Sequence, residues 1–348
     1  MTRNNSIVWA PSLAALALAL FAAALPARAE VTGFEITPVG HGVYAVIAKP
    51  GYASNGAFIV NQDDVVVVDT QLRPSWARGV IAEIKKVTNK PVRYVINTHW
   101  HRDHLQGNQA YVAAYPGVTI IQQQLAREDQ LKFQPVEIKT RAPEEIARLQ
   151  KLLSGGKNEK GAPLSAADRK ELERLLDLQH AYVAEIPQIQ LVPGTLVFDH
   201  TLVLHDSGRE IDLYYYGYAH SRGDLVVYLP AEKIVMTGDF LESQVPKMPS
   251  AYPAKWLNAL QSIQKLDWTL NIPGHGAVQR NKDMLNQFAA YLRDLVAAVK
   301  ESVAKGMTEE QTVRSVDLSQ YAKMPEYDDR NPDAIRRAYQ ELAGKIPE

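Results

Sequence analysis

Short runs of apolar, β-branched residues, separated by Gly, Pro, Asn and Asp, fill the segment from Gly33 to Thr70. The runs GVYAVIA, GAFIVN and DDVVVVDT predict the opening hairpins of a sheet. Apolar residues then recur at helical spacing over residues 74–89, and a buried-type strand is predicted over residues 91–97. This alternation of strand, helix and strand predicts an α/β layered fold.

The pattern changes in residues 122–190, which are charged and favour helix. The break SGGKNEKGAP separates two predicted helices, and Ser165 followed by Asp168 resembles a capping box at the start of the second. A helical hairpin packed on the sheet explains this insertion. A lid or a dimerisation arm is the alternative.

β character returns from Ile189 to Leu204 and continues in EIDLYYYGYAH, DLVVYLP and KIVMTGDF, where each apolar run ends in a polar tip. AKWLNALQSIQKL predicts an amphipathic helix, and WTLNIPGHG predicts one more strand that closes on a Gly-rich loop. Two further helices are expected near Asp283–Ala304 and Pro332–Leu342. They form a C-terminal helical extension over residues 281–348.

The first residues have the features of a secretory signal peptide. Arg3 supplies a positive charge, LAALALALFAAAL is an apolar core, and ARA ending at Ala29 fits a cleavage site. About a dozen apolar residues is short of the roughly 20 that an uncleaved membrane anchor needs. We therefore expect a signal peptide over residues 1–29 and an exported, periplasmic or secreted catalytic domain over residues 30–348, with no stable membrane anchor.

Composition narrows the chemistry of any site. Without residues 1–29 the chain has 36 basic and 39 acidic side chains, a formal charge of −3, which gives no basic footprint for nucleic acid. The 348 residues include no cysteine, so a metal would have to be held by nitrogen and oxygen atoms. The chain is 46 % hydrophobic, which is enough for a sizeable core.

Three of the nine histidines lie in the stretch NTHWHRDHLQGN, directly after an apolar run. His99 and His101 follow the predicted strand at alternate positions, so both can face one way in extended backbone. Asp103 and His104 lie where DHLQGNQAYVAAY would begin a helix. Imidazole and carboxylate groups at this density suit a borderline metal such as zinc, whereas three unrelated surface histidines are the plain alternative.

The hexad HWHRDH resembles the signature of the metallo-β-lactamase superfamily. The similarity continues in VVVVDT upstream and in GYAHSRGD, VMTGD and IPGHG downstream, in the family's order, over roughly Gly33 to Ala290. This resemblance implies an α/β fold of the αββα four-layer type, with two sheets back to back, helices outside and the site at the strand ends along one edge. Here the sandwich would carry the helical insertion and the C-terminal helices.

The resemblance also implies two zinc ions and seven ligands, which are His99, His101, Asp103, His104, His220, Asp239 and His275. One ion would be held by His99, His101 and His220, and the other by Asp103, His104 and His275. Asp239 would bridge the two ions, as in glyoxalase II, and Asp103 would also orient the nucleophile as a catalytic residue. The local sequence agrees with this ligand assignment, because His220, Asp239 and His275 each occupy a polar tip after an apolar strand.

Asp69, which ends VVVVDT, is similar to the family's carboxylate that orients a ligand histidine, with an ordinary strand-end aspartate as the alternative. Trp100 and the run Tyr214–Tyr216 are expected to pack in the core rather than to line a pocket. The histidines outside these motifs are expected at the surface or in hydrogen bonds, namely His41, His180, His200 and His205.

The family implies a dinuclear zinc hydrolase of a small-molecule substrate, in which a hydroxide shared by the metals attacks a carbonyl or phosphoryl centre. The signal peptide favours a β-lactamase-like activity on cyclic amides or esters. So does KPGYASNGAFIVNQDDVVVVDT, which resembles the N-terminal half of exported class B β-lactamases.

Two departures count against a β-lactamase. Asp239 stands where the best-known subclass has a cysteine ligand, and Glu242 stands where that subclass has a lysine that grips the β-lactam carboxylate. A negative charge at Glu242 should repel this carboxylate. A thioester, lactone or phosphoester hydrolase is therefore the alternative, and a non-catalytic metal-binding scaffold is a remote one.

Overall fold

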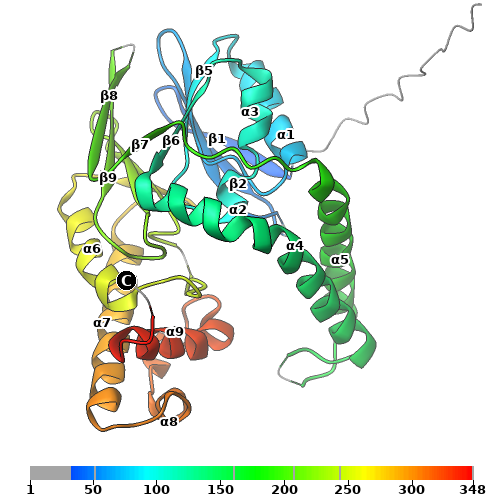
Figure 1. Ribbon diagram of the computed structural model, residues 1–348, viewed down its shortest axis with the longest axis vertical. Coiled ribbons are helices and arrows are strands. Elements are labelled where there is room, and N and C mark those ends of the chain that lie inside the picture. Colours follow the sequence, from blue (N-terminus) through cyan, green and yellow to red (C-terminus); the bar gives the residue numbers. More distant parts are fainter. Residues whose placement is uncertain (1–32, 51, 160, 207, 243, 347–348) are drawn as a thin grey trace, which may run out of the picture. The chain divides into compact units, whose positions relative to one another are not determined.

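A seven-stranded sheet is built mainly from the N-terminal half of the chain (Figure 1). This computed structural model describes residues 33–50, 52–159, 161–206, 208–242 and 244–346. The strands lie side by side in chain order: β1 (Phe34–Gly40), β2 (Val43–Ala48), β3 (Gly56–Val60), β4 (Val65–Val68), β5 (Val92–Ile96), β6 (Thr119–Gln123) and β7 (Leu196–Phe198). The predicted hairpins are confirmed, since β1 to β4 pair antiparallel. The strands from β4 to β7 pair parallel, because helices connect them.

A five-stranded sheet comes from the second half of the chain. Its spatial order is β12 (Leu270–Pro273), β11 (Ile234–Gly238), β10 (Leu225–Leu229), β9 (Arg209–Tyr215) and β8 (Thr201–Asp206). β11 and β12 are parallel, with a helix between them in the chain, and the other pairs are antiparallel. β character was expected from Ile189, but within that segment the first strand, β7, begins only at Leu196. Pro193, just before it, has no N–H for a ladder.

Helices cover the outer faces of both sheets, which confirms the αββα sandwich. The first sheet packs against α1 (Pro74–Val87) and α3 (Asn108–Ala114), and the second against α6 (Pro253–Lys265), α7 (Asp283–Ala304) and α9 (Tyr327–Leu342). β4 shows why its sequence is a continuous valine run. Val66 and Val68 face the second sheet, whereas Val65 and Val67 face the helical layer, so both faces are buried.

The expected helical insertion contains α4 (Gln124–Gly155) and α5 (Ala166–Glu185), followed by the short helix η1 (Ile186–Gln188). The capping box of Ser165 and Asp168 is confirmed. Glu185 at the end of α5 accepts hydrogen bonds from the backbone N (3.0 Å) and hydroxyl (2.6 Å) of Ser75, which fixes this end of the hairpin to α1. Within the described residues, no helix is long and apolar enough to cross a membrane. The expected signal peptide lies outside these residues.

Two helix predictions needed correction. The helix expected after the hexad is split into α2 (Arg102–Leu105) and α3, with Gly107 between them. A Cβ atom at Gly107 would lie 1.9 Å from the carbonyl oxygen of Thr70, so the chain passes too close there for a side chain.

In the C-terminal extension, α8 (Glu309–Ser315) and η2 (Ser319–Tyr321) precede α9, which begins at Tyr327 rather than Pro332. Proline is frequent in the first turn of a helix, which favoured a start at Pro332, but Pro332 lies inside α9.

Asn55 joins the two sheets close to the strand ends. Its side-chain amide donates to the carbonyl oxygens of Pro273 (2.9 Å) and Gly276 (2.8 Å), on either side of His275. Its side-chain oxygen accepts from the backbone N of Ala48 at 2.9 Å. Asn55 therefore fixes the loop after β12 to the first sheet.

Asn55→Ala is expected to lower the free energy of unfolding by about 1–3 kcal/mol, because it removes three hydrogen bonds to backbone groups, one of them to the buried carbonyl oxygen of Pro273. Urea denaturation of the metal-free protein measures the change. Asn258→Ala, at an exposed position on α6, is the matched control and should change stability little. Equal stabilities of the two variants would contradict this role of Asn55.

Candidate metal centre

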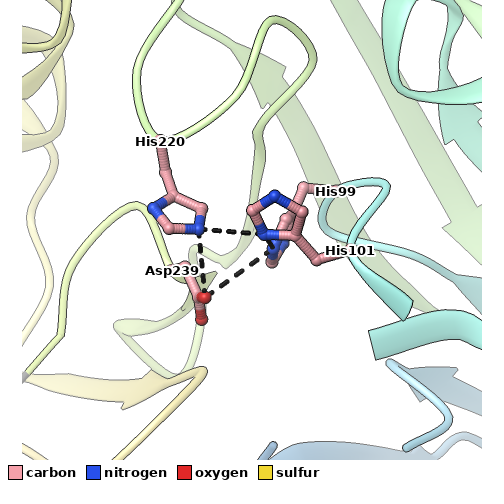
Figure 2. Close-up of side chains that lie close together, drawn as sticks. All are labelled: His99, His101, His220 and Asp239. Carbon is pink, nitrogen blue, oxygen red and sulfur yellow. Dashed lines mark hydrogen bonds and ion pairs between the residues drawn. The ribbon is translucent and has the colours of Figure 1, made fainter. Parts of the chain in front are cut away.

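Three histidines and one aspartate converge beyond the carboxyl ends of β5 and β11 (Figure 2). The Nδ1 atom of His101 lies 3.0 Å from Nε2 of His99 and 3.0 Å from Nε2 of His220. Oδ2 of Asp239 lies 3.3 Å from Nε2 of His220 and 3.7 Å from Nε2 of His99. The four ligand atoms lie within 4.8 Å of one another, so a single ion between them could reach all four.

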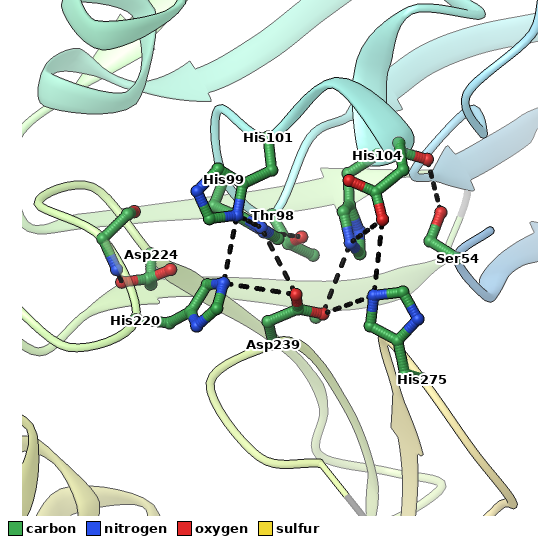
Figure 3. A network of polar contacts seen from close by, with 12 residues as sticks. Ser54, Thr98, His99, His101, His104, His220, Asp224, Asp239 and His275 are labelled. Atoms are coloured by element: carbon green, nitrogen blue, oxygen red, sulfur yellow. Dashed lines mark hydrogen bonds and ion pairs between the residues drawn. The ribbon is translucent and has the colours of Figure 1, made fainter. Parts of the chain in front are cut away.

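A second group lies on the other side of Asp239 and consists of Asp103, His104 and His275 (Figure 3). Oδ2 of Asp103 lies 3.4 Å from Nε2 of His275 and 3.6 Å from Nε2 of His104. Oδ1 of Asp239 lies 3.3 Å from Nε2 of His104 and 3.5 Å from Nε2 of His275. The two carboxylate oxygens of Asp239 thus face two different groups of ligand atoms.

The structure therefore brings together all seven residues that the sequence selected, and it keeps the other four histidines out of both groups. Two of the inward-facing atoms, Nε2 of His104 and Oδ1 of Asp239, are buried and have no hydrogen-bond partner among the described residues. Buried polar atoms without partners are costly, and metal coordination would satisfy both. The donor set of imidazole nitrogens and carboxylate oxygens fits two divalent ions such as zinc.

Asp69 supports the centre through hydrogen bonds to His104 and Thr98. Its Oδ2 atom accepts from Nδ1 of His104 at 2.7 Å, so the proton of this imidazole points away from the centre. Both carboxylate oxygens also accept from Thr98 at 2.8 Å, one from the backbone N and one from the hydroxyl. Asp69 adopts φ = 61°, a left-handed conformation that is uncommon for a residue other than glycine.

Sequence reasoning missed Thr98, which directly precedes the hexad. Its hydroxyl donates to Asp69 and lies 3.1 Å from Nδ1 of His99, so it accepts the outer proton of that imidazole. Ser54 was also missed, and its hydroxyl donates to the carbonyl oxygen of Asp103 at 2.5 Å. Of the two, Thr98 could have been noticed because it adjoins the motif. Ser54 carries no comparable signal.

Helix α4 contacts both loops that carry the three histidines of the first group. Gln134 donates to the carbonyl oxygen of Trp100 at 2.8 Å, between His99 and His101. Asp129 accepts from Arg222, two residues after His220, with an Nη2 to Oδ1 distance of 2.5 Å. Sequence reasoning did not select these residues. They give the helical insertion a direct connection to the candidate site.

Electrostatics distinguish the two groups. Burial lowers the pKa of His101 to about 3 and that of His220 to about 4, and it holds the pKa of His99 well below its usual value. Burial also opposes the charged forms of His104 and His275, but nearby carboxylates, Asp239 first among them, outweigh it and hold both pKa values well above the usual value. At neutral pH the first group is therefore neutral imidazole, and the second binds protons.

Some ligands of the centre are partly exposed to the solvent. The side chains of Asp103 and His275 are 26 % and 25 % exposed, whereas those of His99, His104, His220 and Asp239 are 6 % exposed or less. His101 of the first group is also partly exposed, so a substrate would reach the centre past Asp103, His275 and His101.

Glu242 does not point toward an incoming substrate as the sequence suggested. It is 2 % exposed, accepts a hydrogen bond from Gln244 at 2.7 Å and lies 3.9 Å from the guanidinium of Arg330. Burial, together with the neighbouring Asp239, raises the pKa of Glu242 to about 7. Its charge is therefore directed into the protein, and the expected repulsion of a β-lactam carboxylate is weakened.

Of the aromatics predicted to pack in the core, Trp100, Tyr214 and Tyr216 do so, whereas Tyr215 is partly exposed and donates to the carbonyl oxygen of Arg222 at 2.9 Å. Trp100 is 4 % exposed and packs between the rings of His101 and Phe133, with centroid distances of 4.6 and 5.2 Å. Tyr214 and Tyr216 pack against the core beneath α6 and α7.

The sequence model of the metallo-beta-lactamase superfamily matches residues 50–275, well over half of the chain. The chain belongs to this superfamily. Members of the metallo-beta-lactamase superfamily are hydrolases, and the fold typically binds zinc. The family recognised from HWHRDH is therefore confirmed.

Solved metallo-beta-lactamases share the fold of this superfamily member. The enzyme from Pontibacter korlensis is 19 % identical, with a TM-score of 0.53 over 75 % of this chain and 99 % of its own. FIM-1 from Pseudomonas aeruginosa, solved in a mono-zinc form, is also 19 % identical, with a TM-score of 0.52 over 75 % of this chain and 95 % of its own. At this identity the likeness establishes the fold and leaves the substrate open.

A curated relative within the same superfamily is the linear primary-alkylsulfatase of a Pseudomonas species, which is 21 % identical over 310 residues. The match covers 81 % of this chain and 54 % of the relative. The chain thus spans about half the length of that enzyme.

Metal binding should release protons unequally at the two groups. At pH 7 the first group is already deprotonated, whereas a metal at the second must displace protons from His104 and His275. Because these two pKa values are raised, protons still compete with the metal for the imidazole nitrogens at pH values above the usual pKa range of histidine. This competition disappears as the pH rises through the raised pKa values. Calorimetric zinc titrations in buffers of different ionisation enthalpy should show more protons released by the second equivalent. Equal release by both would contradict the assignment.

Asp129→Asn is expected to weaken zinc binding about tenfold, because Arg222 loses its buried carboxylate partner and no longer fixes the His220 loop. Competition with a chromophoric chelator measures the affinity. Asp177→Asn, at an exposed position on α5, is the matched control. If both variants bind zinc like the wild type, the ion pair serves stability alone.

Proposed function

We propose that this protein is a dinuclear zinc-dependent hydrolase. The observation that carries the proposal is the position of Asp239, whose two oxygens face two separate groups of ligand atoms at 3.3–3.7 Å. Family membership supports hydrolysis, and the nitrogen and oxygen donors support zinc as the metal.

When bound, a pair of zinc ions supplies Lewis acidity and a water nucleophile that is available at neutral pH. Asp103 has the features needed to orient that nucleophile. Burial would raise its pKa, but the neighbouring His104 and His275 outweigh burial and hold the pKa well below its usual value, so the carboxylate is ionised. It is also partly exposed on the substrate side, and Ser54 fixes its backbone.

For the substrate, we propose an ester with an apolar chain, and a primary alkyl sulfate as its first candidate. The alkylsulfatase match covers 81 % of this chain, whereas the superfamily model stops at residue 275. An exposed apolar surface next to the metal groups supports the choice. Phe133 (38 % exposed) contacts Trp100, and Val136 (61 % exposed) lies one turn further along α4.

The position of this surface follows from helix geometry. Phe133 lies four residues after Asp129, so both project from the same side of α4. Asp129 contacts the His220 loop through Arg222, and Phe133 contacts the hexad through Trp100. An alkyl chain on Phe133 and Val136 would therefore place its ester group near the metal ligands.

A β-lactamase-like activity on cyclic amides remains the second candidate, favoured by the likeness of KPGYASNGAFIVNQDDVVVVDT to exported β-lactamases. Thioester, lactone and phosphoester hydrolysis use the same chemistry, and a non-catalytic metal-binding scaffold is the remote alternative. In each case we propose a small-molecule ligand, in keeping with the absence of a basic excess in residues 30–348, and an exported protein, on the signal-peptide pattern of residues 1–29.

A substrate panel tests the proposal with the zinc-loaded and the metal-stripped protein. The panel contains dodecyl sulfate, octyl sulfate, nitrocefin, a thioester, a lactone and a phosphodiester. We expect zinc-dependent turnover, with the highest kcat/KM for dodecyl sulfate. Full activity without metal would overturn the metal-dependent mechanism, and turnover of nitrocefin alone would overturn the alkyl sulfate assignment.

The apolar surface predicts a dependence on chain length. Phe133→Ala should raise KM for dodecyl sulfate about tenfold, because loss of one large apolar contact costs about 1.5 kcal/mol or more. The effect on octyl sulfate should be smaller. Leu131→Ala is the control, since Leu131 is also exposed (45 %) on α4 but projects from a different side. The same KM change for both chain lengths would contradict contact between Phe133 and the chain.

A further inference from the structure

We infer that Ser250 is the positioning residue of His101: its hydroxyl accepts the Nε2 proton of this imidazole and so presents Nδ1 to the metal. The inference rests on the proposed metal centre. No sequence motif marks Ser250, which lies in the loop between β11 and α6, far from the hexad.

His101 is oriented differently from the other four histidines of the centre. His99, His104, His220 and His275 direct Nε2 toward the ligand groups, whereas His101 directs Nδ1 (Figure 3). A neutral imidazole carries one proton, and the nitrogen that binds a metal must be free of it. The proton of His101 must therefore be on Nε2, which points away from the centre.

Ser250 is placed to receive this proton. Its Oγ atom lies 2.8 Å from Nε2 of His101 and 3.3 Å from the carbonyl oxygen of His220. A carbonyl oxygen can only accept, so the single hydroxyl proton of Ser250 goes to His220. The Oγ lone pairs then face His101 and can only accept from it. The direction of both hydrogen bonds is thus determined by the groups present.

Two other ligand histidines also have a hydrogen-bond acceptor for the imidazole proton that points away from the centre. Thr98 donates its hydroxyl proton to Asp69 and accepts the outer proton of His99, and Asp69 accepts the outer proton of His104. Ser250 supplies the corresponding acceptor for His101 from a different segment. It also connects the loops of His101 and His220 through one side chain.

The position of Ser250 is itself constrained by its neighbours. The backbone N of Tyr252 donates to the carbonyl oxygen of Ala219 at 2.8 Å, which ties the loop to the residue before His220. Arg337 of α9 donates to the carbonyl oxygen of Ala251 at 2.6 Å. Ser250 is therefore held in place by the two residues that directly follow it when it contacts His101.

The experiment compares Ser250→Ala, Ser250→Thr and the wild type. Alanine removes the acceptor, and threonine keeps the hydroxyl. Ser302→Ala is the matched control, because Ser302 is a buried serine that donates to Ala298 within α7. Zinc affinity is measured by chelator competition, and the imidazole N–H of His101 is observed by nitrogen-15 NMR of the zinc-loaded protein.

We expect Ser250→Ala to bind zinc about 10–100-fold more weakly and to lose the slowly exchanging Nε2 proton signal of His101. Ser250→Thr should keep both, and Ser302→Ala should match the wild type. If Ser250→Ala retains wild-type affinity and the proton signal, the inference is overturned while the metal centre stands. If the wild type binds no zinc, the metal centre and this inference both fall.

Discussion

The carboxylate of Asp239 is the group on which the rest of the site depends. It is 5 % exposed, and each of its oxygens faces a different set of imidazole nitrogens. An ionised carboxylate at such burial is costly unless charges compensate it, and the protonated His104 and His275 do so, holding its pKa well below the usual value. The same positive charge would be supplied by metal ions, so the protein is built around a place for cations.

The αββα sandwich explains how seven residues from four segments reach one place. Strands β5, β11 and β12 end at the same edge of the sandwich, and each is followed by a ligand of the centre. Asn55 then fixes the loop of His275 by linking the two sheets. Within the first sheet, Thr98 joins the hexad loop to Asp69. The packed sheets supply rigidity, and the ligands themselves sit on loops.

The helical segments of this chain add contacts that the sandwich alone lacks. Helix α4 reaches the loops of His101 and His220 through Gln134 and Asp129. Helix α9 donates hydrogen bonds to the loop between β11 and α6 from Arg330 and Arg337. The insertion and the C-terminal extension, two separate parts of the chain, thus both fix the ligand loops, and α4 also carries the apolar surface proposed for the substrate.

The sequence by itself determined the chemistry and the architecture. The informative features were local patterns, namely the strand tips, the hexad and the valine run. Such patterns indicate which residues are buried, where the backbone runs as strand or helix, and which side chains can bind a metal. The tertiary structure alone decided that Nδ1 of His101 faces inward, that Glu242 is buried, and that Ser250 and Asp129 support the centre. Ser250 lies 149 residues from His101, and Asp129 lies 93 residues from Arg222. A contact between such distant segments leaves no periodicity in the chain, because it depends on packing of whole layers rather than on the spacing of residues.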